Sequence, residues 1–186
     1  YDNSSQSSWD VNRTINISTL DTISPYFSLI PNSTNINYGQ GFGVDFDAQD
    51  ETSFGSYSIN WTNYFSINQS GYLKNTTQLS AGIYNINISI NDSSGNTNST
   101  IYQVVVNKAI PTLTFLANSG TSNLTLIYPQ QVNISSVSDF GSVGLDKDNI
   151  NYLFNNGLNV ILGVGSYIFR ANVTGNQNYS DVSYRY

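Results

Sequence analysis

The sequence predicts an all-β protein made of two tandem β-sandwich domains that follow an unpaired N-terminal strand. Apolar and polar residues alternate along much of the chain, a period of two that is typical of half-buried strands. One segment recurs 83 residues further on, which indicates two copies of the same unit. Asn-X-Ser/Thr triplets are frequent throughout, and this triplet is the acceptor for N-linked glycan in extracellular proteins.

The alternation is clearest in residues 82–90 and 165–174. In each segment four apolar side chains share one face of the predicted strand, because successive side chains of a strand point to opposite faces of the sheet. Residues 44–48 and 101–106 are predicted strands as well. The inward positions are Tyr84, Ile86, Ile88 and Ile90 in the first segment and Tyr167, Phe169, Ala171 and Val173 in the second.

The internal repeat sets the predicted domain boundaries. Leu79-Ser-Ala-Gly-Ile-Tyr84 recurs as Leu162-Gly-Val-Gly-Ser-Tyr167, and the segments around Pro25 and Pro111 look like matching domain starts. A period near 85 residues with about seven short strands is the size of a β-sandwich. We therefore expect one domain at 21–107 and a second at 108–186.

Residues 1–20 fall outside both predicted domains. They contain a predicted strand that carries Trp9, Val11, Ile15 and Ile17 on one face and resembles the last strand of a preceding domain. The repeat places the last strand of the second domain at about 184–189, while the sequence stops at Tyr186. We therefore expect a spare strand at the start of the chain and a shortened one at its end.

Composition disfavours several classes of function. The chain has no Cys, His or Met and a net charge of −6, so it lacks disulfides, the commonest general base and the basic surface that nucleic acid requires. A Ser-His-Asp arrangement is impossible without His. No apolar run is long enough to span a bilayer. We expect a protein that is not an enzyme and has no cofactor, no nucleic-acid partner and no membrane span.

Fourteen Asn-X-Ser/Thr triplets occur in the 186 residues. Chance placement at this composition gives about six, so the triplet itself is favoured and an extracellular or cell-surface location is indicated. Asn16, Asn87, Asn133 and Asn172 lie between apolar neighbours and are predicted to point outward. The glycosylation candidates are Asn3, Asn12, Asn16, Asn32, Asn60, Asn68, Asn75, Asn87, Asn91, Asn98, Asn123, Asn133, Asn172 and Asn178.

The Leu-x-x-Gly-x-Tyr steps that end at Tyr84 and Tyr167 resemble the tyrosine corner of immunoglobulin-like sandwiches, in which the Tyr hydroxyl bonds an upstream backbone group. Residues 64–73 resemble the Phe-x-Ile-x-x-x-x-Gly-x-Leu hairpin of cadherin-like domains. Most of the chain is thus similar to the tandem immunoglobulin-like repeats of archaeal and bacterial surface proteins. Subunits of archaeal extracellular filaments, the threads and bundling pili, are similar in being small glycosylated β-proteins that share a strand between neighbours.

Asp45, Asp47, Asp50 and Glu51 form the acidic cluster of the sequence and are a candidate calcium site. The alternation with Val44, Phe46 and Ala48 also fits a plain strand with a solvated polar face, and we favour that interpretation. Asp146 and Asp148 are a weaker candidate of the same kind. The 106–111 junction lacks the carboxylates of cadherin calcium linkers, so no metal is predicted there.

The resemblance and the spare strand together lead to a functional hypothesis. We expect a structural subunit of an extracellular filament or surface layer, in which residues 9–19 add a strand to the second domain of a neighbouring copy. The partners are then copies of the same chain, joined head to tail. The alternative is a fragment of an adhesin stalk or a carbohydrate-binding surface protein, with Trp9 and Trp61 as platform residues. For Trp61 and Phe65 we favour a place in the core.

Overall fold

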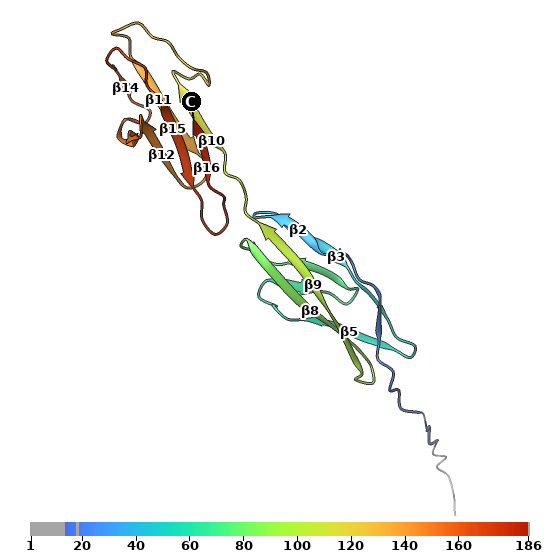
Figure 1. The fold of residues 1–186 in the computed structure, drawn as a ribbon. Helices are drawn as coiled ribbons and strands as arrows, with labels where there is room; N and C mark the ends of the chain where they lie inside the picture. Colours follow the sequence, from blue (N-terminus) through green and yellow to red (C-terminus); the bar gives the residue numbers. More distant parts are fainter. Residues whose placement is uncertain (1–13, 18, 186) are drawn as a thin grey trace, which may run out of the picture.

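The computed structural model describes residues 14–17 and 19–185. The chain is almost entirely β, with 49% strand and 2% helix, which confirms the predicted fold class. The strands gather in two groups that follow one another along the chain (Figure 1). Within the described residues, no helix, including the short 3-10 turn Leu153–Asn155, is long and apolar enough to cross a membrane.

The first group of strands contains a four-stranded sheet in the order β2-β9-β8-β5, a three-stranded sheet β3-β7-β6 and the pair β1-β4. All neighbours in these sheets are antiparallel except β2, which runs parallel to β9. The bounds are β1 Tyr26–Leu29, β2 Thr34–Asn37, β3 Gly43–Asp45, β4 Asp47–Gln49, β5 Phe54–Ile59, β6 Phe65–Ile67, β7 Tyr72–Asn75, β8 Gly82–Asp92 and β9 Thr97–Asn107.

The second group contains a four-stranded and a three-stranded sheet, and its β15 and β16 are shorter than β8 and β9 of the first group. Its sheets are β13-β12-β15-β16 and β10-β11-β14. The bounds are β10 Leu113–Ala117, β11 Val132–Ser138, β12 Ser142–Lys147, β13 Ile150–Asn151, β14 Asn159–Val160, β15 Phe169–Thr174 and β16 Val182–Arg185.

Each group of strands encloses its own apolar core. In the first, Ile86 and Ile88 of β8 are fully buried against Phe46, which lies between β3 and β4. In the second, Ala171 and Val173 of β15 pack with Leu145 of β12. The alternating residues of β8 and β15 face inward as the sequence predicts, because burial of apolar area stabilises this register at roughly 25 cal/mol per Å².

The ends of the second group differ from expectation. β15 begins at Phe169 and not at Gly165, and β16 begins at Val182, two residues before the predicted start. β16 pairs with β15 from Val182 to Arg185, whereas β9 pairs with β8 along almost its whole length. The last strand is therefore present, and its described part pairs over residues 182–185.

The two groups touch through the loop that follows β15. The backbone N–H of Ala81 donates to Asn178 Oδ1 at 2.9 Å, and Gln177 Nε2 donates to the Ala81 carbonyl at 2.6 Å. The ring of Tyr179 packs between Tyr38 and Phe140, with centroid distances of 5.3 and 3.6 Å. The division into domains at 21–107 and 108–186 stays a prediction that the two separate cores support.

Candidate functional site

An apolar groove of about 520 Å³ lies in the second group of strands. Residues 120–126 form one wall and residues 162–169 the other, and the buried side chains of Val132 and Ile134 also line it. Leu124 and Leu126 on the first wall are 44% and 37% exposed. Exposed apolar side chains around a hollow of this size indicate a surface that contacts another molecule.

On the second wall, the backbone of residues 165–167 has no ladder partner among the described residues. Gly165, Ser166 and Tyr167 make no backbone ladder there, although they precede β15 directly. An exposed edge of this kind is a template for one more strand.

The first group shows how the equivalent place is filled. Gly82 and Tyr84, the counterparts of Gly165 and Tyr167, pair with Val106 and Val104 of β9. Both valines are buried, with exposed fractions of 3% and 0%. The outer side of this stretch of β9 is covered in turn by the parallel strand β2. Within residues 118–131, where a counterpart of β2 would lie, the structure has no strand beyond a single bridge at Gly120.

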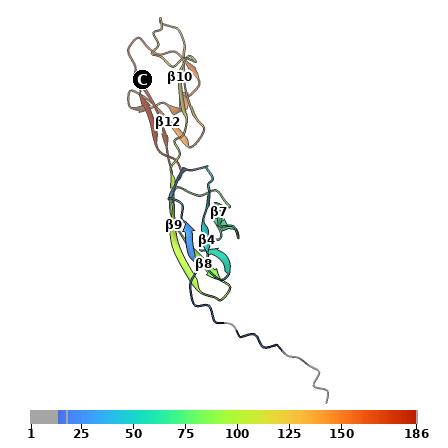
Figure 2. The same cartoon turned by 90° about the vertical axis from the view of Figure 1, so that its right-hand side faces the viewer.

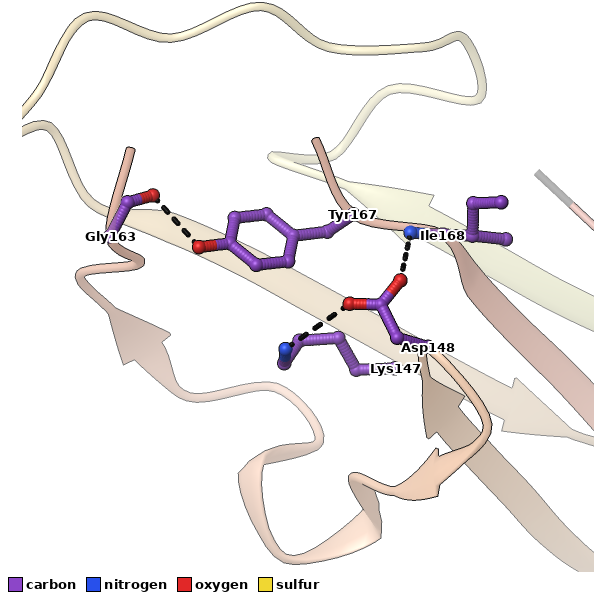
Figure 3. A network of polar contacts seen from close by, with 5 residues as sticks. All are labelled: Lys147, Asp148, Gly163, Tyr167 and Ile168. Atoms are coloured by element: carbon purple, nitrogen blue, oxygen red, sulfur yellow. Dashed lines mark hydrogen bonds and ion pairs between the residues drawn. The ribbon is translucent and has the colours of Figure 1, made fainter. Parts of the chain in front are cut away.

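Polar contacts hold the start of the 165–168 edge in place (Figure 3). The Tyr167 hydroxyl donates to the Gly163 carbonyl at 2.9 Å, and the Lys147 ammonium lies 4.5 Å from the centre of the Tyr167 ring. The backbone N–H of Ile168 donates to Asp148 Oδ1 at 2.8 Å. This hydrogen bond and the neighbouring Lys147 charge lower the pKa of Asp148, which is therefore a carboxylate at neutral pH.

Tyr84 makes the matching hydrogen bond in the first group, from its hydroxyl to the Ser80 carbonyl at 3.0 Å. In both copies the acceptor lies four residues upstream of the tyrosine. This is the geometry of a tyrosine corner, and it fixes the chain just before the strand that carries the inward residues.

The predicted donor strand lies only partly within the described residues. Trp9 and Val11 lie outside them. Ile15 and Ile17 are described, form no strand, and are 82% and 93% exposed. The predicted strand is thus absent at residues 14–17 of the single chain, where no neighbouring strand supplies hydrogen bonds. In both views this segment leads away from the first group, at the end opposite to residues 118–130 (Figures 1 and 2).

The acidic residues are divided between two places. Asp45 and Asp47 are exposed, as predicted, but the predicted strand 44–48 is divided at Phe46 into β3 and β4, which lie in different sheets. Asp50 and Glu51 instead lie near Asp21, with one carboxylate oxygen of each residue within 4.8 Å of the others. Sequence reasoning missed Asp21 because only the fold brings it to the end of β4. Asp146 is half-buried on β12, and Asp148 accepts a hydrogen bond from the Ile168 backbone N–H.

The aromatic residues correct one prediction. Phe65 is buried, but Trp61 is 48% exposed and has a positive φ of 57°. Its ring lies 5.9 Å from that of Tyr64 and 6.2 Å from that of Tyr84, centre to centre. Trp61 lies in the connection between β5 and β6 and is not part of a core cluster.

The asparagines of the triplets are also placed differently from one another. Asn87 and Asn172 are exposed on β8 and β15, as the alternation predicts. Asn133 is half-buried instead, because its Nδ2 donates to the Gly157 carbonyl at 2.7 Å. Asn16 is exposed but lies in no strand.

The groove itself was not found from the sequence, although the repeat contained a usable signal. The offset of 83 residues aligns Gly165-Ser-Tyr167 with a segment of β8 that pairs with Val104 and Val106 of β9. A comparison of the strand partners in the two copies therefore directs attention to residues 165–167.

No protein-family model matches the chain, and no curated protein sequence does either. Several solved structures are similar to it. The titin domains Z1Z2 in complex with telethonin are 10% identical over 89% of this chain and 95% of theirs, with a TM-score of 0.49. Drosophila N-cadherin EC1-4 is 14% identical over 88% of this chain and 48% of its own, with a TM-score of 0.44. The SrpA adhesin of Streptococcus sanguinis is 13% identical over 66% of this chain and 93% of its own, at 0.40.

Proposed function

We propose that this protein is a structural subunit of a glycosylated extracellular filament or surface layer that assembles head to tail by donor-strand complementation. The observation that carries the proposal is the backbone of Gly165–Tyr167, which lines the groove just before β15 and has no ladder partner among the described residues. A strand added there would supply the missing hydrogen bonds and cover the groove.

The donor is the N-terminal segment of a second copy. A strand in this place must present two apolar side chains two residues apart, as Val104 and Val106 do in the first group. Ile15 and Ile17 have this spacing and are otherwise exposed to solvent. In the proposed register the donor runs antiparallel to the edge, with Ile15 beside Tyr167 and Ile17 beside Gly165. Trp9 and Val11 would extend the same apolar face.

The positions of donor and groove favour contact between two molecules. They lie at opposite ends of the described chain, so the described part of the donor cannot reach its own groove (Figure 1). A contact that joins one end of a subunit to the other end of the next does not close on itself, and it therefore produces a linear polymer.

The location outside the cytosol rests on the triplets. Seven of them have exposed asparagines whose Nδ2 makes no hydrogen bond within the described residues. Sugar on Asn87 and Asn172, which are exposed on β8 and β15, would hinder stacking of these sheets against those of neighbouring subunits. Glycosylation thus supports assembly end to end over stacking side by side.

A cysteine pair tests the register, because the natural chain contains no cysteine. In the proposed register Asn16 lies directly opposite Ser166, at a cross-strand distance that a disulfide can bridge. The full-length variant N16C/S166C should form a ladder of covalent multimers under mild oxidation, and reduction should return it to monomers on a denaturing gel.

Two controls make this result interpretable. N16C or S166C alone can form nothing larger than a disulfide dimer, and N16C/V164C places the second thiol two residues away from the proposed register. Ladders from N16C/S166C, and from none of the control variants, support the proposal. Equal ladders from N16C/V164C would contradict the register, and no ladder from any variant would contradict complementation at this edge. A groove filled by other residues of the same chain would give this last result.

The exposed aromatic group at Trp61 favours a second candidate, a carbohydrate-binding surface. Trp61, Tyr64 and Tyr84 lie within 6.2 Å of one another, centre to centre, and flat aromatic faces of this kind pack against sugar rings. We expect W61A to abolish retention on a polysaccharide column if this function exists. Equal retention of W61A and the parent chain would contradict it.

A further inference from the structure

The asparagines of the Asn-X-Ser/Thr triplets fall into two structural groups. Twelve of the fourteen lie within the described residues. In five of them the side-chain amide is half-buried, or its Nδ2 already donates a hydrogen bond: Asn75, Asn91, Asn98, Asn133 and Asn178. In seven the side chain is exposed and its Nδ2 makes no hydrogen bond within the described residues: Asn16, Asn32, Asn60, Asn68, Asn87, Asn123 and Asn172.

The chemistry of N-glycosylation distinguishes these groups. The co-substrate is an oligosaccharide activated on a lipid phosphate. The amide Nδ2 attacks C1 of the sugar, the C1–O bond to the phosphate breaks, and one Nδ2 proton leaves to a base of the transferase. The product therefore has one N–H fewer and a bulky substituent on Nδ2, and both changes require an amide that faces solvent.

Asn133 on β11 uses both of its Nδ2 protons. One donates to the Gly157 carbonyl at 2.7 Å, and the other donates to Asn159 Oδ1 at 3.1 Å. These bonds fasten the loop before β14 to β11, and the side chain is half-buried between the two. A sugar at Nδ2 would remove one of these bonds and would have to occupy the space of the loop.

Asn91 fills an irregularity in the sheet. The register between β5 and β8 shifts between Phe54 and Ser56, where the ladder lacks a regular partner. Asn91 Oδ1 accepts from the Ser56 backbone N–H at 3.1 Å, and its Nδ2 donates to the Asp92 carbonyl at 3.2 Å. The side chain thus satisfies backbone groups that the bulge leaves without a strand partner.

Asn75 and Asn98 tie strands to distant segments. Asn75 Oδ1 accepts from the Phe42 backbone N–H at 2.9 Å, and its Nδ2 donates to the Thr77 carbonyl at 3.0 Å. Asn98 Nδ2 donates to the Pro25 carbonyl at 3.0 Å, which joins β9 to the segment before β1.

Asn178 holds the two groups of strands together. Its Oδ1 accepts from the backbone N–H of Ala81, a residue that is 7% exposed and lies in the first group. Gln177 and Tyr179 on either side of it also contact the first group. A sugar on Asn178 would stand in this contact and separate the two surfaces.

We propose that Asn75, Asn91, Asn98, Asn133 and Asn178 stay unmodified in the folded protein and act as structural amides, while the seven exposed asparagines carry the sugar. The inference rests on the extracellular location in the proposed function and not on polymerisation. Asn123 lies on a wall of the groove, so its glycan would stand at the groove's rim. Asn16 lies on the donor face opposite to Ile15 and Ile17, so its glycan would project away from the groove.

Paired substitutions within one triplet test this assignment. Changing the Asn removes both the triplet and the amide, whereas changing the Ser or Thr removes the triplet and keeps the amide. The full chain is secreted from a host that performs N-glycosylation, and each variant is measured by intact mass, glycopeptide analysis and thermal unfolding. The pairs are N133A with S135A and N178A with S180A for the structural group, and N87A with S89A for the exposed group.

At Asn133 and Asn178 we expect no change in glycan mass from either variant. N133A should lower Tm by roughly 4–8 °C because backbone groups lose their partner, while S135A should leave Tm near that of the parent. At Asn87 both variants should lose the same glycan mass, with little change in Tm.

Three results would overturn the inference or the proposal beneath it. Sugar on the peptides of Asn133 or Asn178 contradicts the assignment, and equal Tm losses from N133A and S135A contradict the structural role of the amide. An absence of sugar at every exposed triplet contradicts the glycoprotein part of the proposed function instead.

Discussion

Replacement of Tyr84 by Phe removes one hydroxyl and keeps the ring, so it isolates the tyrosine-corner hydrogen bond. The hydroxyl donates to the Ser80 carbonyl at 3.0 Å, and the ring remains packed against Phe65 at a centroid distance of 5.6 Å. A hydrogen bond of this type contributes about 1 kcal/mol net to the free energy of unfolding. With a urea dependence of about 1–2 kcal/mol per M for a unit of this size, the unfolding midpoint should fall by roughly 0.5–1 M.

Tyr64 provides the matched control in the same aromatic cluster. Its ring lies 6.1 Å from that of Tyr84, and its hydroxyl makes no hydrogen bond within the described residues. Y64F should therefore change the urea midpoint little, as followed by tyrosine and tryptophan fluorescence. Equal shifts for Y84F and Y64F would refute the hydrogen-bond reasoning. Y167F should repeat the effect in the second group, where the acceptor is the Gly163 carbonyl.

Three further predictions concern the turns and the second core. Burial opposes the charge of Asp92, but hydrogen bonds from the turn outweigh this effect and lower its pKa. The ionised Asp92 therefore stabilises the fold above about pH 4, the pKa of the unfolded state, and this contribution is lost as pH falls through the lower pKa of the folded state. In D92N, the free energy of unfolding, measured with urea from pH 7 to pH 2, should fall less steeply in acid. G71A should lower the free energy of unfolding by more than about 3 kcal/mol, because φ of Gly71 is +87° and a Cβ would lie 1.9 Å from the Phe46 carbonyl oxygen. G95A, at φ +92° in open space, should cost only about 1 kcal/mol, and similar losses for both would contradict the steric reasoning. Leu145 is 1% exposed, so L145A should lower the free energy of unfolding by about 2–5 kcal/mol and shift one of two calorimetric transitions. A shift of a single common transition would argue against independent domains.

Much of the fold could be predicted because strand burial is written locally in the sequence. Ile86, Ile88 and Ile90 alternate with polar residues, and a sheet with one buried face admits only the register that turns all three inward. The same reasoning placed Phe46 inside and Asp45 outside.

The predictions that failed depend on contacts between distant segments. Asn133 lies between apolar neighbours, a pattern that predicts an outward side chain, yet its Nδ2 donates a hydrogen bond to the Gly157 carbonyl of a loop that lies over it. Trp61 has a large apolar side chain of the kind that is usually buried, yet it has a positive φ and is half-exposed. Local pattern carries no record of which loop covers a strand or which way a turn directs its side chain.

The sequence alone determined the all-β class, the repeat, the inward faces of β8 and β15 and the excess of glycosylation triplets. These properties follow from the period of side-chain direction along a strand and from composition, and both are local. The tertiary structure decided which asparagines are exposed, brought Asp21 to Asp50, and placed residues 165–167 beside the groove without a ladder partner among the described residues. Each of these depends on which segments meet in space, because hydrogen-bond partners and burial are set by neighbours that can be a hundred residues away.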